Sequence, residues 1–105
     1  MYQFGEIVLL EYPYTDLSGI KQRPAVVLKD TGDSDFIVAR VTSQVKQTAY
    51  DVEIDEWQNA GLLKPSVVRI HKLTTLETVL VKRVMGNLSV KDAGKLYAAL
   101  KKLFE

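Results

Sequence analysis

Two short apolar runs end in polar side chains that can contact a ligand. These are an arginine at one run and a threonine, a serine and a glutamine at the other. Arg23 precedes the run at residues 25–28, and a second set follows the run at residues 36–41. An arginine side chain offers a planar fork of donors to phosphate oxygens, and hydroxyls and an amide at a strand exit can contact a ligand instead of a neighbouring strand. A surface arginine and turn-forming hydroxyls remain the alternative interpretation. The second set is Thr42, Ser43 and Gln44.

Strand alternation predicts how the arginine is presented, because successive side chains of a strand point to opposite faces. Pro24, Val26 and Leu28 then share an apolar face, so Arg23 is expected on the other face, turned away from the core. A proline at the start of a strand forfeits only a terminal ladder bond. Arg23 is therefore expected at the root of a rigid strand.

Three further cations are expected beside these residues. Arg40 shares strand parity with Thr42, while Lys21 and Lys46 lie close to the two sets in sequence. Positive side chains in a groove attract the backbone of a single-stranded nucleic acid. Arg40, Lys21 and Lys46 are therefore substrate-binding candidates, together with Ser43 and Gln44.

The elements that must position these side chains are mostly short strands, followed by one helix. Many short strands in a small region favour a curled sheet or barrel, because a flat sheet would leave exposed edges. Acidic residues first and glycine last predict one or two helical turns at residues 55–61. The strands are expected at residues 7–10, 25–28, 36–41, 50–54 and 67–70, separated by turns at 15–19, 30–35 and 61–65.

The C-terminal segment predicts an amphipathic helix packed on the sheet. Ser89 and Asp92 fit a weak capping box, in which both side chains satisfy free amides of the first helical turn. Apolar residues recur at steps of three and four, with lysines on the opposite, solvated side. The apolar set is Ala93, Leu96, Tyr97, Leu100, Leu103 and Phe104, and the lysines are Lys91, Lys95 and Lys102.

Composition limits the possible functions. A chain of 105 residues is one domain's worth, so residues 1–105 are expected to form a single domain. There is no cysteine, which excludes disulfides, thiolate metal sites and a cysteine nucleophile. The formal net charge of +1 does not fit a protein that coats duplex DNA, so positive charge must be local. With no leader-like or membrane-spanning apolar run, a cytoplasmic location and no membrane contact are expected.

The order of these motifs resembles the MazF/PemK toxin family. The matching pieces begin at Gly5-Glu6 and continue through Pro13-Tyr14-Thr15-Asp16, Arg23-Pro24 and Thr42-Ser43-Gln44 to Ser66-Val67-Val68. The resemblance covers nearly the whole chain. It departs at Gly5-Glu6, where the family has Gly-Asp, in a shorter loop before Arg23, and at His71-Lys72, where several relatives have an acidic residue and Gln.

The resemblance implies a mainly β chain with a helix (α+β), an SH3-like β-barrel with a packed C-terminal α-helix. It implies a homodimer that cleaves single-stranded RNA without acting on DNA directly, and a cognate antitoxin as inhibitor. The family's catalytic arginine matches Arg23, and its catalytic threonine or serine matches Thr42. No metal or other cofactor is expected.

Other residues leave alternatives open. A single histidine, His71, excludes a two-histidine nuclease, but His71 can still line a groove alone. Trp57 and Tyr50 can stack bases, although a lone tryptophan is more often core or interface. Solvation explains the acidic groups better than metal ligation does. These groups are Asp33/Asp35 and Asp51/Glu53/Asp55/Glu56.

Two non-catalytic functions compete with the nuclease. A gyrase poison of the same barrel fold ends in a Trp-Gly-Ile-like tail, whereas this chain ends Lys101-Lys102-Leu103-Phe104-Glu105. A silent barrel that binds a protein segment would not need Arg23 for any effect.

Overall fold

The computed structural model describes residues 1–13, 20–44 and 48–105. The mainly β chain with a C-terminal helix that the sequence predicts is confirmed. No helix in these ranges combines the length and the apolarity that a membrane-spanning segment needs. The elements are β1 (Glu6–Pro13), β2 (Ile20–Asp30), β3 (Asp35–Thr42), β4 (Asp51–Ile54), β5 (Ser66–Glu77), the 3-10 turn η1 (Thr78–Leu80), β6 (Val81–Asn87) and α1 (Val90–Leu103).

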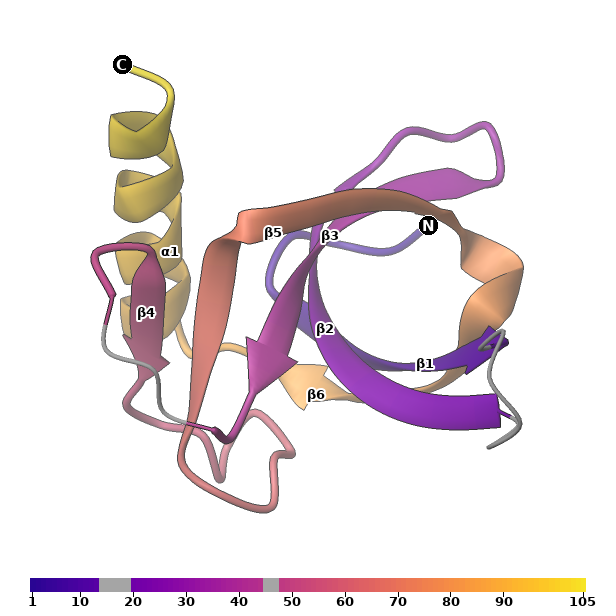
Figure 1. Cartoon of the computed structure of the whole chain (residues 1–105), viewed down its shortest axis with the longest axis horizontal. Coiled ribbons are helices and arrows are strands. Elements are labelled where there is room, and N and C mark those ends of the chain that lie inside the picture. The colour runs from indigo at the N-terminus through magenta and orange to yellow at the C-terminus, as the bar shows by residue number, and fades with distance from the viewer. Residues whose placement is uncertain (14–19, 45–47) are drawn as a thin grey trace.

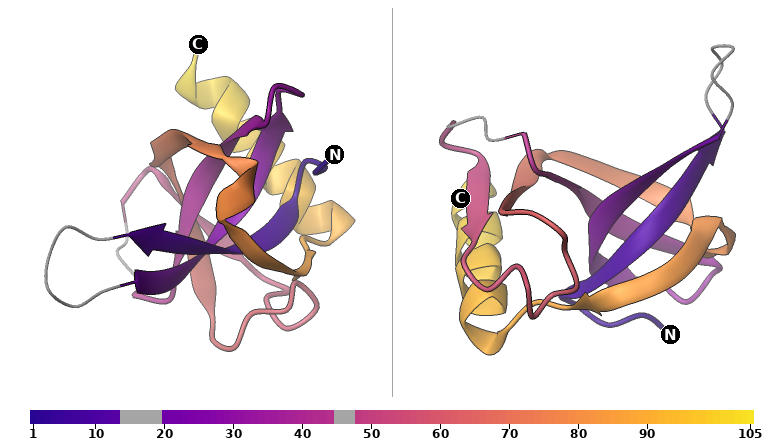
Figure 2. Two further views of the ribbon diagram at one scale, coloured as in Figure 1. Left: turned by 90° about the vertical axis from the view of Figure 1, so that its right-hand side faces the viewer. Right: turned by 90° about the horizontal axis from the view of Figure 1, so that it is seen from below.

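The strands form one antiparallel sheet in the order β4-β5-β3-β2-β1-β6. Figure 1 shows the sheet curling round on itself, with β5 arching from β4 to the far side of the molecule. In the described part of the chain, no pairing joins the edge strands β4 and β6, so the curled sheet is open. The views in Figure 2 show α1 beside β4, at one end of this curled sheet.

Both faces of the sheet carry a buried core. Val26 belongs to a cluster that includes Leu96 of α1, while its neighbours Ala25 and Val27 belong to a second cluster with Phe36. A strand buried on both faces reads as a continuous apolar run rather than an alternating one. The first cluster lies between sheet and helix, and the second lies inside the curl. Tyr2 packs on the second cluster, with its ring centroid 5.4 Å from that of Phe36.

The apolar runs of the sequence all lie in strands, but the second half of β5 and the whole of β6 were not predicted. The burial of β6 explains the omission, since no residue of Val81–Asn87 is fully buried. An edge strand without a buried stripe gives no period-2 hydrophobic signal. The same holds for β5 beyond Ile70, where exposed and half-buried residues follow one another.

Residues 55–61 form hydrogen-bonded turns, so the predicted helical turns are wrong. One bond of α-helical spacing forms, from the N–H of Ala60 to the carbonyl oxygen of Glu56 at 3.3 Å, and a tighter bond follows from the N–H of Gly61 to the carbonyl oxygen of Gln58 at 3.1 Å. Gly61 then adopts φ +83° and passes so close to β6 that an added Cβ would lie 2.1 Å from the carbonyl oxygen of Met85. A left-handed residue and this backbone contact prevent the helix from continuing. The loop between β4 and β5 thus packs against β6.

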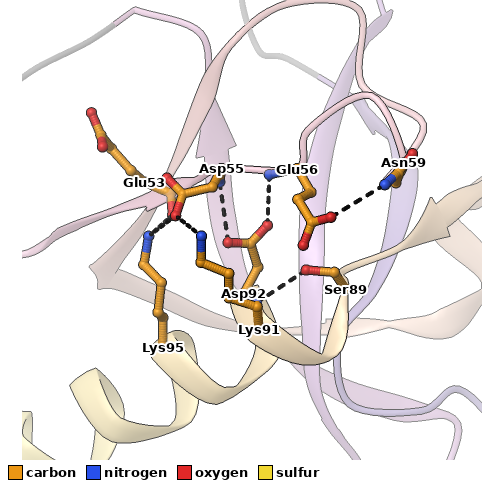
Figure 3. Close-up of polar contacts among 8 residues, drawn as sticks. All are labelled: Glu53, Asp55, Glu56, Asn59, Ser89, Lys91, Asp92 and Lys95. Atoms are coloured by element: carbon orange, nitrogen blue, oxygen red, sulfur yellow. Dashed lines mark hydrogen bonds and ion pairs between the residues drawn. The ribbon is translucent and has the colours of Figure 1, made fainter.

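The helix begins at the predicted cap, but the capping box is only half formed. The Ser89 hydroxyl accepts a hydrogen bond from the N–H of Asp92 at 3.1 Å. The Asp92 carboxylate, 2% exposed, instead accepts from the N–H groups of Asp55 and Glu56 at 3.1 and 2.9 Å. Figure 3 shows that these two bonds fasten the first turn of α1 to the chain after β4. Asp92 therefore docks the helix.

Two of the predicted solvated lysines also take part in docking. Lys91 and Lys95 form ion pairs with Asp55 at 3.3 and 3.1 Å, and Lys95 also donates to the carbonyl oxygen of Glu53 at 2.8 Å (Figure 3). Hydrogen bonds from Lys95 and Lys91 lower the pKa of Asp55 below its usual value. Lys91 is still 65% exposed, as predicted, whereas Lys95 is half-buried, because β4 ends beside that flank of α1.

The apolar side of α1 is narrower than predicted. Leu96 is fully buried, and Leu100 and Leu103 are half-buried against the first cluster. Tyr97 and Phe104 were expected there but are 66% and 73% exposed. The main contacts of α1 are with β4 and β5. The side of the helix that carries Tyr97 and Phe104 faces away from these strands.

Candidate functional site

The site lies where β2 and β3 stop pairing. The last pair at this end of their ladder joins Ala25 to Arg40. Arg23 and Thr42 each lie two residues beyond that pair, on the two strands as they separate. Continuing the register would set these two positions opposite each other, since antiparallel partners advance in opposite directions. The fork between β2 and β3 thus presents the arginine and the threonine to the same opening.

A groove of about 780 Å³ opens at this fork. It brings together the five candidates Arg23, Arg40, Thr42, Ser43 and Gln44. Sequence reasoning missed the remaining polar lining, which comes from β2 next to Arg23, from the loop before β5 and the first residue of β5, and from the unpredicted strand β6. These additional residues are Gln22, Lys64, Ser66 and Arg83, with Leu9, Pro24, Val41, Leu62, Leu63 and Met85 as apolar lining.

Arg23 is not on a solvent face, which corrects the expectation that it turns away from the core. Ala25 and Val27, which share the face of β2 with Arg23, are buried in the second cluster. Since Val26 on the opposite face is buried in the first cluster, both faces of β2 are apolar. Arg23 lies half-buried at the open end of that cluster. There it also lines a second hollow of about 400 Å³, which shares Arg23, Pro24 and Arg40 with the groove. The arginine is therefore held between two hollows.

Thr42 is oriented by its own turn. Its Oγ1 accepts a hydrogen bond from the N–H of Gln44 at 3.1 Å. A hydroxyl has one hydrogen to donate in addition to its acceptor positions. This turn therefore fixes the oxygen and leaves the hydroxyl hydrogen to donate toward a ligand. The turn role and the ligand role, which the sequence offered as alternatives, are compatible.

The groove is locally positive although the chain is nearly neutral. Its described lining contains the cations Arg23, Arg40, Lys64 and Arg83 and no acidic residue. Lys72 adds a cation to the second hollow. Arg69 pairs with Asp51, Lys82 with Glu11, and Lys91 and Lys95 with Asp55, all away from the groove. An anionic polymer is the ligand that this lining favours.

Two of the candidate cations cannot be placed. The backbone of Lys21 pairs with Tyr12 in the β1–β2 ladder, but its side chain lies outside the described residues. Lys46 falls wholly outside them.

Several carboxylates of the acidic groups have partners within the protein. The Thr31 hydroxyl donates to Asp33 and lowers the pKa of that carboxyl. Asp51 accepts from Thr48 and Arg69, and Asp55 from two lysines. Across residues 1–13, 20–44 and 48–105, no group of three or more potential ligands is arranged to hold a metal ion.

The three candidate aromatic residues differ in their surroundings. Trp57 is half-buried against the first cluster, so it serves the core. Tyr50 and His71 are exposed and their ring centroids lie 5.4 Å apart. Neither lines the groove, so His71 is not placed to act at the fork.

The fork of β2 and β3 thus places the guanidinium of Arg23 and the hydroxyl of Thr42 in the lining of one positive groove. The model of the PemK-like, MazF-like toxin of type II toxin–antitoxin systems matches residues 3–104. The chain therefore belongs to this toxin family.

Solved structures show the same fold. MazF-mt6 of Mycobacterium tuberculosis is 24% identical, with a TM-score of 0.76 over 94% of this chain and 95% of that one. An endoribonuclease in complex with its cognate antitoxin, from a mycobacterial species, is 15% identical, with a TM-score of 0.76 over 99% and 95% of the two chains. MazE-MazF from Deinococcus radiodurans gives 18% identity and a TM-score of 0.77 over 98% and 95%. The search of curated proteins found no match.

Proposed function

We propose that the chain is a sequence-specific, metal-independent endoribonuclease toxin that cleaves single-stranded RNA, with Arg23 and Thr42 as catalytic residues. The observation that carries the proposal is the meeting of these two residues in one positive groove at the fork of β2 and β3. Membership of the toxin family and the likeness to solved endoribonucleases support it.

Cleavage without a metal requires the ribose itself to supply the nucleophile. The 2′-oxygen attacks the adjacent phosphorus and loses its proton, the bond from phosphorus to the 5′-oxygen breaks, and that oxygen leaves with a proton. The products are a 2′,3′-cyclic phosphate and a 5′-hydroxyl. Negative charge builds on the phosphoryl oxygens in the transition state, so preorganised donors aimed at them accelerate the reaction.

Arg23 is assigned to that charge and Thr42 to the position of the phosphate. A guanidinium stays protonated in proteins and forms two parallel bonds to phosphate oxygens, so Arg23 is assigned as the electrostatic stabiliser rather than as the base. The Thr42 hydroxyl, held by Gln44, donates one further bond to a non-bridging oxygen. The general base is left unassigned.

Substrate binding is assigned to the other polar groups near the fork. Ser43, Gln44 and Arg40 line the groove, and Lys21 and Lys46 remain candidates from sequence proximity. Lys64 and Arg83 join them, because both are cations of the same lining.

The proposal includes the partners and the location that the resemblance implies. A cognate antitoxin occupies the groove, the toxin is a cytoplasmic homodimer, and the open curled sheet corresponds to an SH3-like barrel. The mycobacterial and Deinococcus structures, which hold an antitoxin or MazE, support the antitoxin.

The test is cleavage of unstructured RNA in excess EDTA by the purified protein and its Arg23→Ala variant. We expect fragments ending in 2′,3′-cyclic phosphate from the wild type and a strong loss with the variant. Sequencing the 5′ ends of the fragments gives the cleaved motif. Equal cleavage by both proteins, or none over many motifs, would reject the nuclease in favour of a binding-only toxin.

A further inference from the structure

A second polar cluster lies across the sheet from the fork. In the register, Ala25 pairs with Arg40, Arg40 pairs with Arg69, and Arg69 pairs with Asp51. Directly paired residues share a face of the sheet. The face that presents Arg40 at the fork therefore continues, one strand further on, to Arg69.

Next to Arg69 the strand β5 bulges outward. Ala39 pairs with Leu73 and the following residue Arg40 pairs with Arg69, so residues 70–72 of β5 have no partner on β3. Bulges re-aim side chains and are frequent beside binding sites. This one holds His71 at the surface and Lys72 on the wall of the second hollow, which also contains Arg23 and Arg40.

His71 is held in place by a buried ion pair. The Arg69 side chain, 11% exposed, bonds through Nε to Oδ1 of Asp51, 3% exposed, at 3.2 Å. Asp51 Oδ2 accepts from the N–H and hydroxyl of Thr48 at 3.1 and 3.0 Å. Arg69 Nη2 then lies 3.3 Å from Nε2 of His71. Since arginine can only donate, a hydrogen bond between these two atoms uses Nε2 of His71 as the acceptor.

Tyr50 completes an exposed pair of rings. Its backbone carbonyl accepts from the N–H of Ile70 at 2.9 Å, which fixes it to β5. The two ring centroids are 5.4 Å apart at an interplanar angle of 46°, and Tyr50 is 47% exposed. Contacts that restrain side chains before a ligand binds reduce the conformational entropy that binding costs. Both rings have such contacts, His71 with Arg69 and Tyr50 with His71.

We propose that the Tyr50–His71 pair is a stacking subsite for one nucleobase of single-stranded RNA, to one side of the phosphate bound at the fork. The inference rests on the proposed nuclease function and names a substrate-binding subsite for it. Proteins that bind single strands combine a cationic track with aromatic rings on which bases stack. Here Arg23, Arg40 and Lys72 supply the cations of the second hollow, while Arg69 pairs with Asp51 and holds His71. Two inter-strand spacings of about 4.8 Å separate β2 from β5.

The test measures the affinity of a 2′-O-methyl RNA oligonucleotide, which binds without undergoing attack. His71→Ala and Tyr50→Ala should each raise Kd about 5- to 100-fold, the range for loss of one base stack. Tyr97→Ala is the control, because it removes another exposed aromatic ring, 66% exposed and paired with Phe4, from α1, away from the groove. His71→Phe keeps the stacking face while losing the Arg69 bond, so it should stay near the wild-type Kd.

Abasic substitution at each nucleotide in turn identifies the stacked base. In the wild type, removing one particular base should raise Kd, and in His71→Ala the same removal should have no further effect. Additive losses at every position, or an unchanged Kd in both alanine variants, would overturn the subsite. That outcome leaves the nuclease intact if Arg23→Ala still abolishes cleavage, whereas absent RNA binding by the wild type contradicts both proposals. Loss of binding only to an antitoxin peptide would assign the rings to a protein partner and reject the RNA subsite.

Discussion

At the scale of single residues, the fork divides the chemistry between a charge and a hydroxyl. The sequence could predict Arg23, Arg40 and Thr42 as candidates, because residue type and strand parity are visible in it. It could not show that both faces of β2 are buried, since alternation alone does not distinguish a one-sided strand from a two-sided one. Arg83 and Lys64 were missed because they reach the groove from a strand and a turn that carry no hydrophobic pattern.

Thr42→Val should lower the single-turnover cleavage rate, while Thr42→Ser should retain most of it. Valine has nearly the same shape but cannot donate to the phosphate, and a hydrogen bond to a charged group contributes about 1.5–3 kcal/mol, or roughly 10- to 150-fold in rate. Serine keeps both the donor and the acceptor for the Gln44 N–H. A valine variant as fast as the wild type would remove Thr42 from the mechanism.

At the scale of elements, the sheet is completed by a backbone contact that no hydrophobic pattern predicts. An added Cβ at Gly86 would lie 2.5 Å from the carbonyl oxygen of Ala60, across the contact between β6 and the loop that follows β4. That loop and β6 both contribute to the groove wall. The helix at 90–103 could be predicted from its cap and apolar period, whereas its docking through Asp92 depends on a loop 36 residues away.

Gly86→Ala should destabilise the fold by about 1–3 kcal/mol, the range for overpacking in a tightly fitted site. Gly94→Ala is the matched control: nothing lies within 4 Å of its added Cβ, and alanine in a helix is favoured over glycine by about 1 kcal/mol. Urea unfolding of both variants measures the difference. Equal stabilities would mean that β6 and the loop do not meet as closely as described.

The docking of α1 should weaken in acid. Lys95 and Lys91 lower the pKa of Asp55 in the folded protein, so its contribution to stability is present above the ordinary carboxyl pKa of about 4 and is lost as pH falls through the lower folded value. The unfolding free energy of the wild type should therefore drop below about pH 4. Asp55→Asn should flatten part of that drop, and an identical pH profile in the variant would contradict the assignment.

At the scale of the whole molecule, positive side chains gather in the groove, while the described carboxylates lie elsewhere on the protein. A net charge of +1 conceals a groove with four cations and no described acid, while the carboxylates pair with lysines and Arg69 elsewhere. Composition predicted that any positive charge must be local, but only the folded sheet brings together cations from β2, β3, β6 and the loop before β5.

RNA affinity should accordingly fall with salt. Each phosphate contact to a single strand contributes about 0.7 to the slope of log Kd against log salt, so four groove cations give a slope of up to about 3. Arg83→Ala should reduce the slope by about 0.7. Lys82→Ala should leave it unchanged, because this neighbour pairs with Glu11 and does not line the groove. Equal reductions in both variants would point to a diffuse surface charge.

The most direct test compares two arginines that share the same rim. Arg23 and Arg40 both line the groove and the second hollow, but only Arg23 is assigned to the transition state. With protein in saturating excess over RNA and EDTA present, the single-turnover rate should fall about 100- to 1,000-fold in Arg23→Ala, as for loss of a transition-state donor. Under the same saturating conditions, the Arg40→Ala variant should cleave at nearly the wild-type rate. Equal rate losses in the two variants, or a full rate in Arg23→Ala, would contradict the account.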